Sequence, residues 1–142
     1  MFTPLYRPRR LRRKEQIRRL VRETTLTADD FILPMFVIPG DDVMTPRGSM
    51  PGHCQLSVDH AVKKAAGFHE MGIRALMLFG IPAKKDARGS DALSDEGIIA
   101  RALRAIKDAV PDLYLIADLC FCEYTDHGHC GVVVDGEVDN DA

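Results

Sequence analysis

The sequence contains no tryptophan, few other aromatic residues (6%) and only four cysteines in 142 residues. Its longest apolar runs, at residues 75–79 and 113–117, are far shorter than the roughly 20 residues needed to cross a bilayer, so we predict no membrane contact. No apolar stretch follows the basic N-terminus before Phe31, which argues against a signal peptide and predicts a cytoplasmic protein. Its 46% hydrophobic and 28% charged residues exclude disordered, collagen-like and disulfide-scaffold proteins.

The total charge is small, −2, but it is unevenly distributed. Residues 1–23 carry nine basic and two acidic side chains, a net charge of +7, whereas residues 24–142 carry −9. A basic arm on an acidic body is typical of nucleic-acid binding, and also of docking on the acidic surface of a sister subunit. The charge pattern alone leaves both interpretations open.

Three apolar segments recur about forty residues apart, with two amphipathic segments between them. The apolar segments predict strands buried on both faces, and the amphipathic ones predict helices. The predicted strands are residues 31–39, 74–81 and 113–121, the predicted helices are residues 57–71 and 94–110, and the predicted loops are residues 41–56 and 82–93. Pro34 lacks the N–H that one ladder hydrogen bond of the first strand would need.

Alternation of strand and helix predicts parallel pairing with right-handed crossovers. The two candidate architectures are an open doubly wound sheet and the first part of a (β/α)₈ TIM barrel. No Gly-x-Gly-x-x-Gly turn follows the first strand, and polar residues follow the carboxyl end of each strand, so the barrel is favoured. Three strands cannot close a barrel. We therefore predict an arm at residues 1–28 and the first β/α units of an incomplete TIM barrel at residues 29–142.

Three of the four cysteines lie within eleven positions, at Cys120, Cys122 and Cys130. On a strand that extends to residue 121, the thiols of Cys120 and Cys122 would share one side with the carboxylate of Asp118. Three thiolates favour zinc, and three protein ligands leave a fourth position for water or substrate, as in catalytic zinc sites.

Two alternatives to that open zinc site remain. A fourth ligand from His127 or His129 would close the site and make it structural. The cysteines could also be reduced thiols that only pack, because their spacing is not an established zinc pattern. Cys54, alone in the first long loop, is predicted to be structural or incidental.

Residues 118–131, Asp-Leu-Cys-Phe-Cys-Glu-Tyr-Thr-Asp-His-Gly-His-Cys-Gly, closely resemble the metal-binding signature of the porphobilinogen synthases, also called 5-aminolevulinic acid dehydratases. The resemblance covers essentially the whole chain. Further segments similar to family motifs are residues 7–12, 49–52, 78–80, 85–86, 89–90 and 138–142.

The resemblance implies a (β/α)₈ barrel that condenses two molecules of 5-aminolevulinate, with loss of water, into porphobilinogen for tetrapyrrole and haem biosynthesis. It implies that Cys120, Cys122 and Cys130 hold a zinc ion that polarises a carbonyl or keeps a substrate amine unprotonated. Asp118 matches an active-site aspartate of the family and is predicted to orient that amine or handle a proton. Any additional Mg²⁺ site is expected outside this chain.

The resemblance also gives the arm a function, because in this family the arm embraces a neighbouring subunit in dimers that assemble into octamers. We favour this homo-oligomer contact over nucleic acid, since no aromatic side chain lies between Arg7 and Arg22 for base stacking.

Three features depart from the family pattern. Gln55 stands where the motif after Ser-Met-Pro-Gly usually has arginine, and Ala117 replaces a usual hydroxyl residue beside Asp118. The family forms Schiff bases on two lysines in later barrel strands, whereas the last lysine here is Lys107. We therefore expect an N-terminal portion of the enzyme that is inactive alone. The alternative is a zinc-bound structural or regulatory half-barrel that acts through partner contacts.

Overall fold

The computed structural model describes residues 9–141, so residues 1–8 of the predicted arm and Ala142 lie outside the described residues. Five strands form one sheet in the order β2-β3-β1-β4-β5, with β1, β3, β4 and β5 parallel and β2 antiparallel to β3. Their bounds are β1 (Ile32–Val37), β2 (Met44–Pro46), β3 (Cys54–Leu56), β4 (Ala75–Gly80) and β5 (Tyr114–Ala117). The three predicted apolar strands are thus present as β1, β4 and β5.

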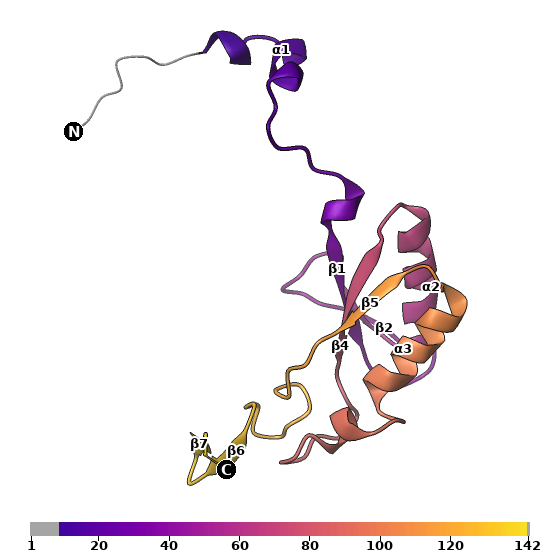
Figure 1. Cartoon of the computed structure of the whole chain (residues 1–142). Helices are drawn as coiled ribbons and strands as arrows, with labels where there is room; N and C mark the ends of the chain where they lie inside the picture. The colour runs from indigo at the N-terminus through magenta and orange to yellow at the C-terminus, as the bar shows by residue number, and fades with distance from the viewer. Residues whose placement is uncertain (1–8, 142) are drawn as a thin grey trace, which may run out of the picture.

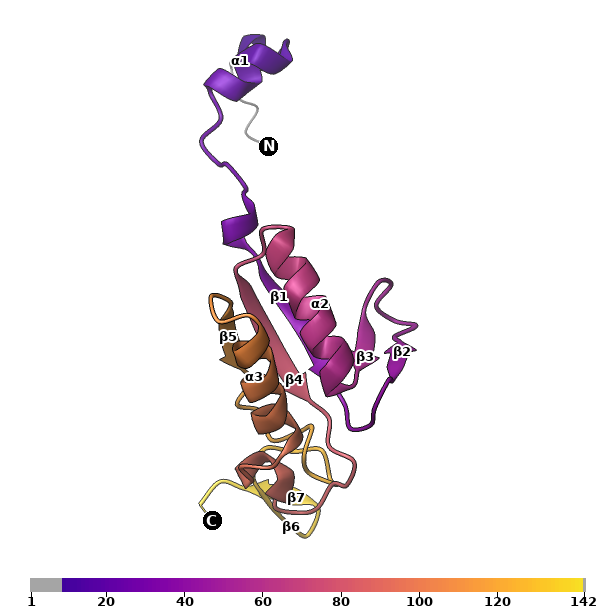
Figure 2. The same cartoon turned by 90° about the vertical axis from the view of Figure 1, so that its right-hand side faces the viewer.

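Helices α2 (Val58–Glu70) and α3 (Ile98–Ala109) lie side by side on one face of this sheet (Figure 2). Alternate strand residues such as Val37, Leu76 and Leu78 point toward them and are fully buried. Small residues on α2 (Ala61 and Ala65) allow close packing on the strands. Because β1, β4 and β5 are neighbours in chain order and both helices cover one face, the described residues lack the two-sided helix arrangement of a doubly wound sheet.

The opposite face of the sheet is apolar and is not covered by any helix of the described residues (Figures 1 and 2). The Phe36 and Phe79 rings on this face have centroids 5.5 Å apart, and the Arg47 guanidinium lies 5.8 Å from the centroid of Phe36. Ile32 and Tyr114 at its periphery are 52% and 67% exposed. The hydrophobic core therefore lies entirely on the helix side.

The predicted loop at residues 41–56 is wrong in part, because it contains the β2–β3 hairpin. This hairpin also explains why Pro34 is tolerated in β1. The Ile38 N–H donates to Leu56 toward β3, so backbone groups two and four residues earlier face the same side. Since β3 pairs only with Phe36 and Val37, the donor that Pro34 lacks has no ladder partner there.

Helix α3 begins at Ile98 rather than at the predicted residue 94. The Asp91 carboxylate accepts a hydrogen bond from the Ile98 N–H (3.0 Å), so it caps the helix from seven residues upstream. Gly97 makes this possible, because a Cβ there would collide with the Asp91 carbonyl oxygen. Asp95 and Glu96, which fall inside the predicted helix at residues 94–110, lie before the observed helix.

Residues 9–27 extend away from the sheet (Figure 1) and bury no side chain in η1 (Arg10–Arg12) or α1 (Glu15–Leu20). A short 3-10 helix, η2 (Ala28–Asp30), leads into β1 and starts with a capping box between Thr27 and Asp30. In the described part of the chain, no helix has the length and apolar content for a membrane crossing.

After β5, the chain forms a second small sheet from β6 (Val132–Val134) and β7 (Glu137–Asp139). Asp135 and Gly136 both have positive φ (51° and 86°), as a two-residue type I′ turn requires. This hairpin is absent from the elements predicted from the sequence.

Candidate metal centre

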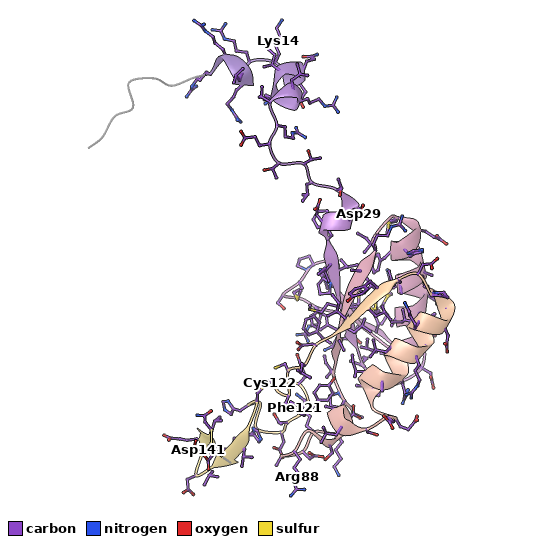
Figure 3. All side chains as sticks on the ribbon, viewed as in Figure 1. Lys14, Asp29, Arg88, Phe121, Cys122 and Asp141 are labelled. Atoms are coloured by element: carbon purple, nitrogen blue, oxygen red, sulfur yellow. The ribbon has the colours of Figure 1, made fainter. Side chains whose placement is uncertain are left out.

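The three predicted metal-ligating thiols converge beyond the carboxyl end of β5. The sulfur of Cys130 lies 3.3 Å from that of Cys120 and 3.2 Å from that of Cys122, and all three Sγ atoms lie within 4.8 Å of one another. All three cysteines are free thiols, and these separations exceed the ~2.05 Å of a disulfide. Figure 3 shows Cys122 and Phe121 between the main sheet and the β6–β7 hairpin.

The route by which the thiols meet differs from the prediction. Strand β5 ends at Ala117, so Cys120 and Cys122 do not share a strand face. Instead, the chain turns after Phe121, whose carbonyl accepts the N–H groups of Tyr124 (2.9 Å) and Thr125 (3.0 Å). The Phe121 N–H donates to the Cys130 sulfur (3.2 Å) and holds the third thiol against the other two. The cluster is therefore a loop structure.

The loop between β4 and α3 supports this turn. Asp86 forms an isolated parallel bridge with Thr125: its N–H donates to the Tyr124 carbonyl (3.4 Å) and its carbonyl accepts from the Asp126 N–H (3.2 Å). The Asp86 carboxylate accepts the N–H groups of Arg88 (2.9 Å) and Ser90 (3.1 Å), which lowers its pKa. Asp86 thus stabilises its own loop and ties it to the turn after Phe121.

Hydrogen bonding separates the proton affinities of the thiols. Contacts with the Cys130 and Cys120 thiols raise the pKa of Cys122 to about 12. The same contacts, together with the Phe121 N–H, lower the pKa of Cys130. Cys130 is consequently the first of these two sulfurs to become a thiolate. A metal that takes all three must displace protons, so its affinity rises with pH.

Asp118 lies at the edge of the thiol cluster and continues the β5 pairing through an N–H that donates to the Leu78 carbonyl (3.1 Å). Oxygen atoms of Asp118 and Glu123 lie within 4.8 Å of each other and of the Cys120 sulfur. Burial and the Asp118 charge raise the pKa of Glu123, and Lys85 partly opposes this shift. Glu123 Oε2 is buried without a hydrogen-bond partner among the described residues. Glu123 was not predicted as a site residue, because the only sequence feature that points to it is its position directly after Cys122.

The two histidines of the signature do not join the thiol group. Within residues 9–141, the groups of side chains able to hold one ion include Cys120, Cys122 and Cys130 together, without His127 or His129. The His127 ring instead contacts the backbone on both sides, with Nε2 3.3 Å from the Ala87 carbonyl oxygen. The three thiols are therefore the candidate ligand group, without a histidine.

Comparison with known proteins identifies the family. The protein-family model described as delta-aminolevulinic acid dehydratase matches residues 5–142 of this chain. The chain belongs to the delta-aminolevulinic acid dehydratase family. It is 50% identical over 135 residues to the family member of Synechococcus elongatus and 51% identical over 136 residues to that of Helicobacter pylori. Both alignments cover 95% of this chain but only 41% and 42% of those relatives.

A solved structure of the same family agrees with the fold. The delta-aminolevulinic acid dehydratase (porphobilinogen synthase) of Toxoplasma gondii, in complex with the reaction product porphobilinogen, matches with a TM-score of 0.88 and 34% identity. The match covers 96% of this chain and 40% of the Toxoplasma chain. The parallel α/β arrangement described above is therefore that of this family.

Proposed function

We propose that this chain forms the N-terminal part of a (β/α)₈ porphobilinogen synthase, which condenses two 5-aminolevulinate molecules into porphobilinogen with loss of water. The convergence of Cys120, Cys122 and Cys130 is the observation that carries the proposal. Family membership and the product-bound Toxoplasma relative support the reaction and its substrate. Three parallel strands in chain order, with both helices on one face, support the barrel.

We propose zinc as the metal at the three thiols. In tetrahedral zinc sites with Zn–S distances of about 2.3 Å, the sulfur atoms lie about 3.8 Å apart, and the three Sγ atoms here lie within 4.8 Å of one another. When bound, zinc would supply a Lewis acid that polarises a carbonyl or keeps an amine unprotonated. Asp118 would orient the substrate ammonium or accept its proton, because its carboxylate borders the cluster. Any Mg²⁺ would bind outside this chain.

The arm at residues 1–28 would mediate homo-oligomer contact in a cytoplasmic assembly, from dimer to octamer. Its described part supports this role, because Leu20 and Leu26 are 85% and 68% exposed. Apolar side chains without partners in their own chain favour a protein surface over a nucleic acid as the contact.

Removal of one thiol tests the metal site. We expect Cys122→Ser to lose the Co²⁺ charge-transfer band and the equimolar Zn²⁺ that the unmodified chain retains, because two thiolates leave the ion incompletely held. Cys54→Ser is the matched control, since Cys54 lies in β3 away from the cluster. Equal zinc retention by the Cys122 variant would contradict the site.

Catalysis requires more than this cluster. The resemblance to the family implies that the two Schiff-base lysines lie in later barrel strands. Among the described lysines, Lys107 is occupied by the Leu113 carbonyl (2.9 Å). We therefore expect the 142-residue chain alone to form no porphobilinogen from 5-aminolevulinate in a colorimetric pyrrole assay, even when zinc is bound. Pyrrole formation by this chain would overturn the proposal that it holds the metal site without the Schiff-base lysines.

A zinc-bound structural or regulatory half-barrel is the second candidate, and the exposed arm favours it. The two candidates differ in the reading frame beyond residue 142. Continuation into strands that bear two lysines supports the enzyme, whereas a stop codon there supports the module.

A further inference from the structure

We propose that His127 is a positioning residue of the metal centre: its ring, held in one tautomer, ties the backbone before Cys130 to the loop between β4 and α3. This inference rests on the proposed function only in that the three thiols are taken to hold the metal. It concerns a side chain that is not itself one of the ligands.

The hydrogen bonds define the tautomer. The His129 N–H donates to Nδ1 of His127 (3.2 Å), and a backbone N–H can only donate, so Nδ1 must carry a free lone pair. In the neutral ring the proton then resides on Nε2. That nitrogen lies 3.3 Å from the Ala87 carbonyl oxygen, which can only accept. In this tautomer both ring nitrogens are hydrogen-bonded to backbone groups 42 residues apart in sequence.

The His127 ring lies between two other hydrogen bonds that hold this loop. Upstream of it, Asp126 N–H donates to the Asp86 carbonyl (3.2 Å), and Thr125 Oγ1 donates to the His129 carbonyl (3.1 Å) downstream. Thr125 is buried, at 3% exposure, so its end of the loop is fixed. Without the His127 ring, residues 127–129 would lose their contact with the neighbouring loop just before Cys130.

His129 provides a matched comparison two positions away. Its ring stacks on that of His127 with centroids 6.0 Å apart, but no side-chain hydrogen bond of His129 is found among the described residues. His129 is also exposed, whereas His127 is half-buried. Any effect of removing an imidazole near Cys130, apart from the bridge, should therefore appear equally in His129 variants.

Three variants of the full chain separate the two contacts. His127→Asn can still accept from the His129 N–H through a local turn but is too short to reach Ala87. His127→Gln can reach Ala87 but lacks an acceptor in the place of Nδ1. His129→Gln is the control. Each protein is titrated with Co²⁺, and Zn²⁺ affinity is measured by competition with a chromophoric chelator.

We expect His127→Asn and His127→Gln each to weaken Zn²⁺ binding by about 10- to 100-fold, as loss of an outer-shell partner typically does. His129→Gln should stay within about twofold of the unmodified chain, as neutral surface substitutions do. Far-ultraviolet circular dichroism of each variant shows whether its fold is retained. Equal affinities for the His127 variants and the control would overturn the inference while leaving the metal site intact.

A second measurement needs no metal. Long-range ¹H–¹⁵N correlation spectra of the ring nitrogens should show His127 as the neutral Nε2–H form, with an unprotonated Nδ1. A dominant Nδ1–H form would overturn the inference even if affinity fell. Failure of the unmodified chain to bind Co²⁺ or Zn²⁺ would overturn the proposed function instead.

Discussion

At the scale of single residues, Gly80 shows how the cysteine-bearing loop after β5 constrains the sheet. It ends β4, and a Cβ there would collide with the Tyr124 hydroxyl and approach the Ile98 side chain to 3.1 Å. The Tyr124 side chain is only 4% exposed, so its neighbours hold the ring in place, and the same burial raises its pKa to about 12. Gly80 is thus required for close approach of two elements.

We predict that Gly80→Ala destabilises the chain by about 1–3 kcal/mol, the usual cost of inserting a methyl group into a packed core. Urea denaturation followed by circular dichroism measures the change. Gly67→Ala is the control, since a Cβ at Gly67 in α2 meets nothing within 4 Å. That substitution should stabilise the helix by up to about 1 kcal/mol. A neutral Gly80→Ala would show that Tyr124 does not restrict this position.

Some residues of the candidate site could be predicted from the sequence, and others could not. Cys120, Cys122 and Cys130 could be predicted, because thiol chemistry is carried by residue type and the three lie close in sequence. The position of Glu123 beside Asp118 could not, since it depends on a turn that no periodicity signals. The bridge from His127 to Ala87 joins two loops forty residues apart, a contact that no local pattern encodes.

At the scale of elements, the cap of α3 is the contact most easily tested. The Asp91 carboxylate accepts from Ile98 N–H across a segment that includes η3 (Ser90–Leu93), so one side chain fixes both the helix start and the loop beside the metal centre.

We predict that Asp91→Ala lowers the free energy of unfolding by about 1 kcal/mol, as loss of a helix cap does. Asp91→Asn, which keeps an acceptor oxygen, should recover most of it. Asp95→Ala is the control, because Asp95 lies before the helix and only its backbone carbonyl is used, by Arg104. Thermal unfolding distinguishes the three. Equal losses for Asp91→Ala and Asp95→Ala would contradict the capping role.

The apolar periodicity predicted β1, β4, β5 and α2 to within a few residues, because hydrophobic burial determines them. The same periodicity extends β5 too far, to residue 121, because it counts Leu119 as a buried strand residue. The Leu119 side chain is 89% exposed in the loop that carries the three cysteines. The periodicity missed β2 and β3, each three residues long, because such short strands carry too little pattern. The β6–β7 hairpin has a local sequence signal, Asp135-Gly136 between a valine-rich and an alternating segment, which is typical of a type I′ turn.

At the scale of the whole molecule, the apolar sheet face opposite the helices is the surface that most favours self-association. Ile32 and Tyr114 leave it exposed to water, and β5 has an unpaired edge among the described residues. Such a surface favours self-association or a loosely packed state.

We therefore predict that the 142-residue chain binds 8-anilinonaphthalene-1-sulfonate and self-associates in sedimentation velocity experiments. Ile32→Ser should weaken that association by roughly fivefold, about 1 kcal/mol of lost apolar burial. Leu93→Ser is the control, since Leu93 is also exposed (73%) but lies in η3, away from this face. A monomer with a sharp thermal transition would contradict the prediction.

The order of strands in the sheet also bears on synthesis. Because β1, β4 and β5 pair in the order in which the ribosome makes them, each strand finds its partner edge already present. Most pairing spans only one strand–helix unit, which favours fast, stepwise folding. The three cysteines proposed to hold the metal follow β5 in the chain, so the proposed site would be complete soon after the third strand has docked, early in the life of the nascent chain.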